Sequence, residues 1–211
     1  MGGTEIYMSI YQNKPPGYDL AHVPHIGNLS TKQLYLQLRG QFQKVSWRKL
    51  VCNNRGLPRW TFILRLAALG RLSTRDRLYK WGIQTTGICP LCEVENESIP
   101  HLFFACTISA QVWRNLLLWI DVNRAPMMWD DELLWAEQHA KGRSPKAEMY
   151  RMVLAAAVYF VWKERNFRIF QNKRQSTTSM IKQVIQEVHI KATKDAKLIT
   201  WLENHNFYPV C

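Results

Sequence analysis

Apolar side chains recur at helical intervals along most of the chain, and this periodicity predicts a series of α-helices. The clearest pattern begins at Pro58 and ends at Gly70, with its apolar members one or two helical turns apart: Trp60, Ile63, Leu64, Ala67 and Ala68. Similar patterns predict further helices at 30–38, 46–51, 73–81, 113–120, 130–141, 146–171 and 178–203. The fold class predicted from these patterns is all-α.

Polar residues mark the start of some of these helices, and the apolar residues of the two C-terminal helices indicate which of their faces are buried. Ser30 and Ser73 each open a segment with the form of a capping box. The helix at 178–203 has an apolar stripe that consists of Ile181, Val184, Ile185 and Val188. The stretch 155–162 in the preceding helix has no clear polar face. We therefore expect it to be buried, either within this chain or against a partner.

The helical pattern is absent in two places, and these breaks predict the domain organisation. Residues 1–29 form an irregular lead-in with one short strand pattern at 6–10, and residues 83–100 are rich in turn-forming residues. We expect a small helical domain at 30–125, built around the loop-rich segment as a knuckle. A C-terminal helical region with long helices follows at 126–211.

The net charge of +12 is concentrated in one segment of the chain. Between Arg39 and Lys80, eleven basic residues face one acid, Asp76, and the rest of the chain is nearly balanced. An excess of this kind favours a polyanionic partner. Aromatic residues that offer stacking surfaces for bases are interleaved with these cations: Trp47, Trp60, Tyr79 and Trp81. The alternative is that Trp60 and Trp81 belong to the core and that the cations only solvate helix faces.

Other features exclude membrane and secreted classes of protein. The longest apolar run, 152–162, has eleven residues, whereas a helix that spans a bilayer needs roughly 20. No apolar signal segment stands at the N-terminus, and the five cysteines are an odd number. We therefore expect a soluble intracellular protein of the nucleus or cytoplasm, with no membrane partner and no small-molecule substrate.

Three cysteines and a histidine lie within eighteen residues, in the order Cys89, Cys92, His101 and Cys106. Their C-x2-C-x8-H-x4-C spacing is typical of a tetrahedral Zn²⁺ site. Because four protein ligands leave no open coordination position, one structural zinc is predicted. The alternatives are that the C-x2-C pair has a redox role and that His101 is a core histidine. The remaining Cys52 and Cys211 have no partner at ligand spacing and are predicted to be free thiols.

The residues around these four ligands resemble the zinc-binding domain at the C-terminal end of reverse transcriptases of LINE-type (non-long-terminal-repeat) retrotransposons, especially plant ones. The matching motifs are Gly27–Tyr35, Trp47, Gly70–Leu78, Trp81-Gly82, Glu97-Ser98, the His101–Cys106 segment and Val112-Trp113. The resemblance spans about residues 27–120. Further along, Val161–Phe170 is similar to a helix that often follows the domain in those polyproteins.

The resemblance implies that this region holds template RNA or target DNA near the polymerase during target-primed reverse transcription. The Tyr-x-Asp-Asp motif of the polymerase itself does not occur in this sequence. Met128-Trp129-Asp130-Asp131 resembles this motif only superficially. We interpret its two aspartates as N-cap residues at the start of a helix. We therefore expect a C-terminal fragment of the polyprotein without its polymerase domain, and no enzyme activity.

The sequence thus predicts a non-catalytic, zinc-stabilised module that binds RNA or DNA. Arg71, Arg75 and Arg77 are the foremost candidates for phosphate contacts, because the last two are expected on successive exposed turns next to the zinc. Further candidates are Lys80, Arg48, Lys49 and Arg59. One alternative is a protein-interaction or structural module whose C-terminal helices dock on a reverse transcriptase or on another copy. The other is a degenerate retrotransposon fragment without a selected function.

Overall fold

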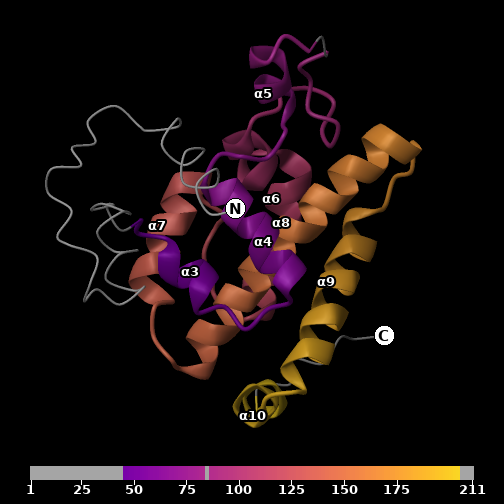
Figure 1. Ribbon diagram of the computed structural model, residues 1–211. Helices are drawn as coiled ribbons and strands as arrows, with labels where there is room; N and C mark the ends of the chain where they lie inside the picture. Colours follow the sequence, from indigo (N-terminus) through magenta and orange to yellow (C-terminus); the bar gives the residue numbers. More distant parts are fainter. Residues whose placement is uncertain (1–44, 84–85, 205–211) are drawn as a thin grey trace, which may run out of the picture. The chain divides into compact units, whose positions relative to one another are not determined.

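The computed structural model describes residues 45–83 and 86–204, and in this part of the chain the fold is all-α, as predicted (Figure 1). All of these described residues belong to one compact unit. The predicted lead-in, its strand pattern, the helix at 30–38 and Cys211 lie outside the described residues. The described elements are α3 Arg48–Cys52, α4 Pro58–Ala68, α5 Arg75–Lys80, the short π-helical turn η3 His101–Ala105, α6 Thr107–Trp119, α7 Trp129–His139, α8 Pro145–Gln171, α9 Thr177–Ala192 and α10 Ala196–Asn204.

The longest helix, α8, lies at the centre of the described fold and packs against α4 on one side and α9 on another (Figure 1). Residues 152–158 of α8 are completely or almost completely buried. The apolar stretch of this helix is therefore covered within the chain, which decides between the two options left open by its sequence. From α9, Val184 and Val188 are fully buried, so the predicted stripe of that helix is confirmed.

Aromatic rings join η3 to α6 and α7. The ring of Phe104 stacks on Trp113 with 4.9 Å between centroids, and the ring centroid of Phe103 lies 5.2 Å from that of Trp129. Phe104 adopts a positive φ of 80°, a backbone conformation that costs free energy in a non-glycine residue. Burial of both phenylalanine rings offsets this cost, because full burial of such a side chain contributes about 1.5–3 kcal/mol.

The predicted helix at 178–203 is wrong in one respect, since two helices occupy this stretch. α9 ends at Ala192, and α10 begins at Ala196 after a turn that contains Asp195. The carboxylate of Asp195 accepts a hydrogen bond of 3.0 Å from the backbone N–H of Lys197, which is the geometry of a helix N-cap. It also forms an ion pair with Arg55. A capping residue with a distant partner thus ends one helix and starts the next.

Two predicted helix starts are also corrected. α5 begins after Thr74 rather than Ser73, and no side chain of its own segment caps it. Similarly, Met128 is the N-cap residue of α7, and its side chain forms no capping hydrogen bond. Asp130 and Asp131 lie in the first turn of α7 instead, where their negative charges interact favourably with the positive end of the helix dipole. The interpretation of these two acids as N-caps is therefore wrong, although their placement at a helix start is correct.

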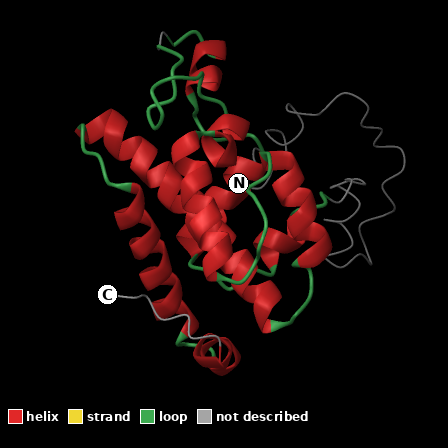
Figure 2. Cartoon of the chain, turned by 180° about the vertical axis from the view of Figure 1, so that it is seen from behind, coloured by secondary structure: helices red, strands yellow, loops and turns green. Residues whose placement is uncertain are grey.

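Figure 2 shows from behind how α5 and the loops on both sides of it stand apart from the packed helices. The loop that follows α5 belongs to the predicted knuckle. In the part of the chain that the structure describes, no helix has both the length and the apolar character needed to cross a membrane.

Candidate metal centre

The four residues predicted as metal ligands converge in the knuckle. One donor atom from each of Cys89, Cys92, His101 and Cys106 lies within 4.8 Å of the donor atoms of the other three. The sulfurs of Cys89 and Cys106 are 4.0 Å apart, and His101 Nε2 lies 3.3 Å from the sulfur of Cys92. Residues 17 positions apart in the chain are thus brought to a single point.

A tight backbone turn positions the first two cysteines. The N–H of Glu93 donates to the carbonyl of Cys89 over 2.9 Å, and the N–H of Cys89 donates to the carbonyl of Glu95 over 2.7 Å. Gly87 and Glu93 both have positive φ, of 72° and 59°. A Cβ on Gly87 would come within 3.3 Å of the side-chain oxygen of Asn96, so a larger residue would be strained there.

The second pair of ligands lies at the two ends of η3 and the start of α6. The N–H of His101 donates to the hydroxyl of Ser98 over 3.2 Å. Ser109 fixes the turn before α6, since its hydroxyl accepts from the N–H of Phe104 and donates to the carbonyl of Cys106. Because η3 is anchored in the aromatic cluster, both ligands are held by the main core of the protein.

The donor atoms fit a tetrahedral zinc ion. With Zn–S bonds of about 2.3 Å and Zn–N bonds of about 2.0 Å, neighbouring sulfurs stand about 3.8 Å apart and a sulfur and a nitrogen about 3.5 Å apart. The observed separations of 4.0 Å and 3.3 Å are close to these values. Three thiolates and one imidazole also match the preference of Zn²⁺ for sulfur and nitrogen. Zinc bound here would cross-link the loop to η3 and α6, with no coordination position left for water.

The carboxylate of Glu95 orients the histidine ligand. It lies 3.2 Å from His101 Nδ1, on the side of the imidazole away from the cysteine sulfurs. A hydrogen bond at Nδ1 places the proton there and leaves Nε2 free to bind metal. Glu95 is therefore an outer-shell residue of the site, which the spacing of the ligands alone does not reveal.

The two buried thiols titrate differently while no metal is bound. The hydrogen bond to Cys106, and then burial, raise the pKa of Cys89 above the ordinary range of a thiol. The same hydrogen bond lowers the pKa of Cys106. Because zinc binds thiolates, it must displace the protons that the free site retains near neutral pH.

A buried ion pair ties the knuckle to α8. Arg165 Nε donates to Glu97 Oε1 over 2.8 Å, and Arg165 Nη2 donates to Glu97 Oε2 over 2.9 Å. Glu97 also accepts a 2.8 Å hydrogen bond from the N–H of Arg75, the first residue of α5. This contact takes the place of the predicted capping box. A single carboxylate thereby joins the knuckle, α5 and α8.

Two more arginines bind the carbonyl groups of the cysteine turn. Arg168 of α8 donates to the carbonyls of Pro90 and Leu91 over 3.3 and 2.8 Å. Arg75 donates to the carbonyl of Ile88 and, over 2.7 Å, to the hydroxyl of Thr86. Three thiolates with a bound Zn²⁺ would carry one net negative charge, and these guanidinium groups lie beside the metal centre.

The predicted nucleic-acid contacts fall into two groups. Arg75 and Arg77 are half-buried rather than on open turns, because both are bound to backbone carbonyls. Arg59 is exposed but forms an ion pair of 2.8 Å with Glu187. The candidate cations that are exposed and form no side-chain ion pair within residues 45–83 and 86–204 are Arg48, Lys49, Arg71 and Lys80.

The predicted stacking residues also divide. Trp60 is fully buried in the core, and Trp47 is partly buried against it. Tyr79 and Trp81, in contrast, are 73% and 56% exposed. The guanidinium of Arg77 lies over the Trp81 ring at 4.8 Å from its centroid. Of the four aromatic candidates, Tyr79 and Trp81 at the end of α5 therefore have the most exposed rings.

Glu97, Arg165, Arg168 and Glu95 are functional residues that the ligand spacing could not identify. Glu97 and Arg165 both lie in segments that resemble the reverse transcriptase polyproteins, and this was the available signal. Their partnership was hidden because 68 residues separate them.

Comparison with known proteins agrees with this geometry. The family model described as zinc-binding in reverse transcriptase matches residues 29–113, a range that includes all four ligands. Neither the search of curated proteins nor the search of solved structures gave a match. Residues 29–113 are thus similar to the zinc-binding segment of reverse transcriptases, and the Cys₃His cluster within them is a site for one structural zinc.

Proposed function

We propose that this chain is a non-catalytic nucleic-acid-binding module of the kind found in retrotransposon reverse transcriptases, and that it holds RNA or target DNA. The observation that carries the proposal is a surface at the end of α5 that combines exposed aromatic rings with unpaired cations. We call it the α5 surface, and it consists of Arg71, Arg77, Tyr79, Lys80 and Trp81.

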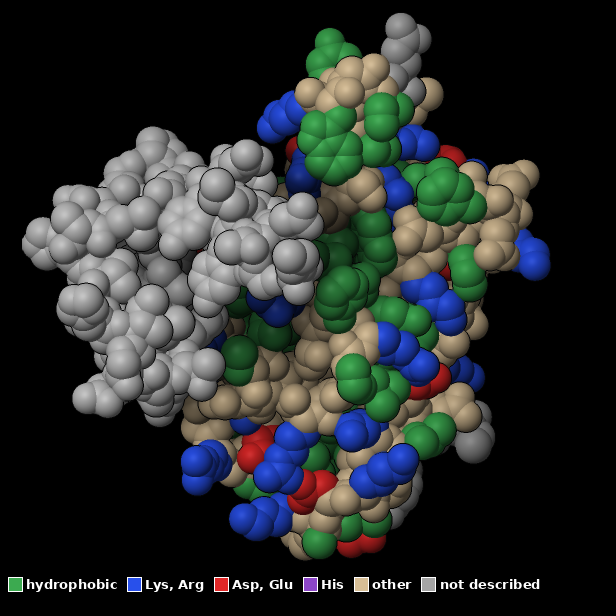
Figure 3. All heavy atoms as spheres, in the orientation of Figure 1, with side chains coloured by type: hydrophobic (Ala, Val, Ile, Leu, Met, Phe, Trp, Pro, Cys, Tyr) green, Lys and Arg blue, Asp and Glu red, His purple; other side chains and the backbone are tan. Residues whose placement is uncertain are grey.

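The chemistry of the α5 surface suits a single strand. Base stacking on aromatic side chains needs an open ring, and the rings of Tyr79 and Trp81 are mostly exposed. Arg71 and Lys80 stand beside them as exposed cations that can contact phosphates. Figure 3 shows apolar and basic side chains side by side on the part of the molecule that contains α5.

The metal centre supports this surface rather than taking part in chemistry. Arg75 connects the start of α5 to Glu97 and to the carbonyl of Ile88, next to the first cysteine ligand. Arg77 holds the preceding loop through the carbonyls of Gly70 and Leu72. Both arginines therefore fix the shape of the α5 surface, and the zinc site fixes the loop on which they depend.

Filter binding of single-stranded RNA and DNA across a salt series tests the proposal. We expect a steep linear dependence of log K on log salt, with the slope reduced by about 0.7 for each phosphate contact that is lost. An R71A/K80A variant should bind more weakly and with a flatter slope. Trp81→Ala should weaken binding by about 1–3 kcal/mol if one base stacks on this ring.

A matched control keeps the total charge equal. Arg114 and Lys182 are exposed cations on α6 and α9 and do not belong to the α5 surface. The R114A/K182A variant should bind like the unmodified chain. Equal loss in both double variants would mean that net charge alone drives binding, and binding without salt dependence would refute the proposal.

A further inference from the structure

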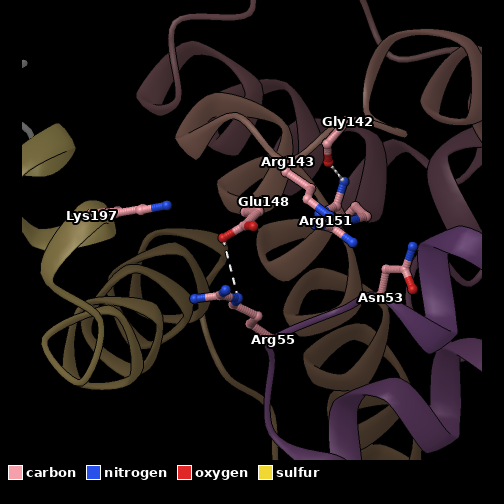
Figure 4. Close-up of a pocket in the computed structure, with 7 residues that line it drawn as sticks. All are labelled: Asn53, Arg55, Gly142, Arg143, Glu148, Arg151 and Lys197. Atoms are coloured by element: carbon pink, nitrogen blue, oxygen red, sulfur yellow. Dashed lines mark hydrogen bonds and ion pairs between the residues drawn. The ribbon is translucent and has the colours of Figure 1, made fainter.

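We propose that a second, separate site binds a phosphate group, either free phosphate or the phosphate of a nucleotide, at the N-terminal end of α8. A pocket of about 390 Å³ lies there, between the loop after α3, the loop before α8 and α10 (Figure 4). Its charged and polar lining side chains are Asn53, Arg55, Arg143, Glu148, Arg151 and Lys197. We call it the α8 pocket.

The central group of the α8 pocket is the guanidinium of Arg151. This side chain is only 2% exposed, and Figure 4 shows it between Gly142 and Asn53. Its Nη1 donates to the carbonyls of Ala140 and Gly142, the latter over 2.8 Å. Its Nε is buried and has no hydrogen-bond partner among the described residues. Nη2 likewise forms no hydrogen bond with a described residue, so the guanidinium of this lining residue has donor capacity that the two carbonyls do not use.

Arg151 also lacks a counter-ion. No carboxylate of the described residues lies within 4.0 Å of its guanidinium, and burial lowers the pKa of Arg151 although Glu148 acts in the opposite direction. Burial of a charge without a partner is destabilising, because the charge loses its hydration. An anion in the pocket would offset that cost.

The acidic groups at the pocket are already paired. Glu148 lies 3.3 Å from Arg55 Nε, and Arg55 also forms an ion pair with Asp195 just outside the lining. Arg143 and Lys197 are exposed and form no ion pair with a described residue. In Figure 4 the ammonium of Lys197 points toward Glu148. With four cations and one carboxylate in the lining, the pocket has a net charge of +3.

The shape and chemistry of the lining favour an oxyanion. Guanidinium groups match the oxygen geometry of phosphate and form strong charge-assisted hydrogen bonds with it. No hydrophobic residue lines the pocket, so its specific contacts come from polar and charged groups. Lys191 and Lys194 line a neighbouring pocket that shares Arg55, and they extend the positive field toward solvent. Figure 3 shows basic side chains gathered around α10.

The α8 pocket is distinct from the metal centre and the α5 surface. Arg151 and Arg165 lie on the same helix, fourteen residues apart, which corresponds to about 21 Å along its axis. One end of α8 thus lines the pocket, and the other end holds the knuckle. Binding at either place can be tested while the other is left intact.

Isothermal titration calorimetry of the full zinc-loaded chain tests the site, with chloride used to keep ionic strength constant. Inorganic phosphate and adenosine monophosphate should each bind saturably, and uncharged adenosine should not. An R143A/K197A variant should lose at least about tenfold in affinity for both ligands, which corresponds to about 1.4 kcal/mol. Because Arg151 is buried, R151M serves as a second variant once circular dichroism shows that it is folded, and it should lose more.

Control variants distinguish binding in the α8 pocket from a general attraction of phosphate to exposed cations. A K173A/K182A variant removes two exposed lysines outside the pocket and should bind phosphate normally. The R71A/K80A variant should do so as well, even if it no longer binds nucleic acid. Tighter binding of the nucleotide than of phosphate would identify a nucleotide as the ligand, and equal binding would identify the phosphate group alone. The proposal is overturned if phosphate does not saturate the chain, if adenosine binds as well as its monophosphate, or if the pocket and control variants lose affinity equally.

Discussion

At the residue scale, each ligand of the metal centre has a distinct supporting contact, and Cys92 is the least buried of the three cysteine ligands. Its sulfur faces His101 Nε2 at 3.3 Å, so replacement of this thiol removes one corner of the tetrahedron without opening a large cavity.

We therefore expect Cys92→Ser to lose tightly bound zinc and to lower the melting temperature of the chain. Metal analysis after dialysis and a thermal melt measure both effects. Cys52→Ser is the matched control, since Cys52 is an exposed free thiol far from the four ligands in sequence. A Cys92→Ser chain that keeps one zinc and full stability would contradict the assignment of this residue.

Zinc affinity should also depend on pH. The pKa of Cys89 is raised, first by its hydrogen bond to Cys106 and then by burial, so this thiol is protonated in the free site. Every proton that zinc displaces weakens apparent affinity about tenfold for each unit by which pH falls. Competition with a chromophoric chelator at several pH values measures this slope. A pH-independent affinity would show that the thiols do not lose protons on binding.

Glu97 is the residue whose loss should be most costly among the outer contacts. It is fully buried, and Glu97→Gln would leave the guanidinium of Arg165 buried without its counter-ion. Removal of one partner from such a pair costs about 3–5 kcal/mol. Denaturant unfolding of the zinc-loaded chain measures this loss. The double variant E97Q/R165M should recover part of it, and a loss in the double variant equal to the sum of the losses in E97Q and R165M would exclude a coupling between the two residues.

At the scale of elements, the features that could be predicted from the sequence are those determined by residues close together in the chain. α4 and α8 agree with prediction within two residues at each end, because a proline start and a long apolar face are local signals. The four metal ligands were also predictable, since their spacing is contained in one short segment.

The remaining features depend on contacts between distant segments. Arg75 and Arg77 look like open cations in the sequence, but the carbonyls that bind them become available only when the loop folds back. The start of α5 uses the carboxylate of Glu97, 22 residues away, instead of a local capping residue. The division between α9 and α10 likewise involves Arg55 and Asp195. No periodicity in the sequence encodes such pairs.

The junction between α9 and α10 gives a prediction at this scale. Asp195→Ala removes a helix cap and an ion-pair partner of Arg55, and loss of a cap alone costs about 1 kcal/mol. We expect a modest fall in the free energy of unfolding, measured with denaturant. Asp131→Ala, at an exposed position in the first turn of α7, should have a smaller effect. If the two substitutions cost the same, Asp195 does not act as a cap.

At the scale of the whole molecule, the hydrophobic core does not end where the family match ends. α8 lies beyond residue 113, yet its buried side chains pack against α4, which lies within the matched segment, and against α6, which begins in it. The predicted boundary at 125 remains a prediction, but the core extends across it.

A chain that stops at residue 125 should therefore fail to fold cooperatively, even with zinc. Removal of α8 exposes the faces of α4 and α6 that it covers and leaves Glu97 without Arg165. Circular dichroism and dye binding measure loss of the folded state, and a chain that ends at residue 204 is the control. Cooperative unfolding of the shorter chain would show that the zinc segment is self-sufficient.

The ion pair between Glu97 and Arg165 also limits how the zinc segment, residues 29–113, can be transferred to another protein. A chimera that receives residues 29–113 without a matching arginine inherits a carboxylate that must be buried with no counter-ion. The glutamate and the arginine should therefore be exchanged together or not at all. A natural or engineered exchange of the zinc segment therefore has to include α8, because Arg165 of this helix neutralises Glu97.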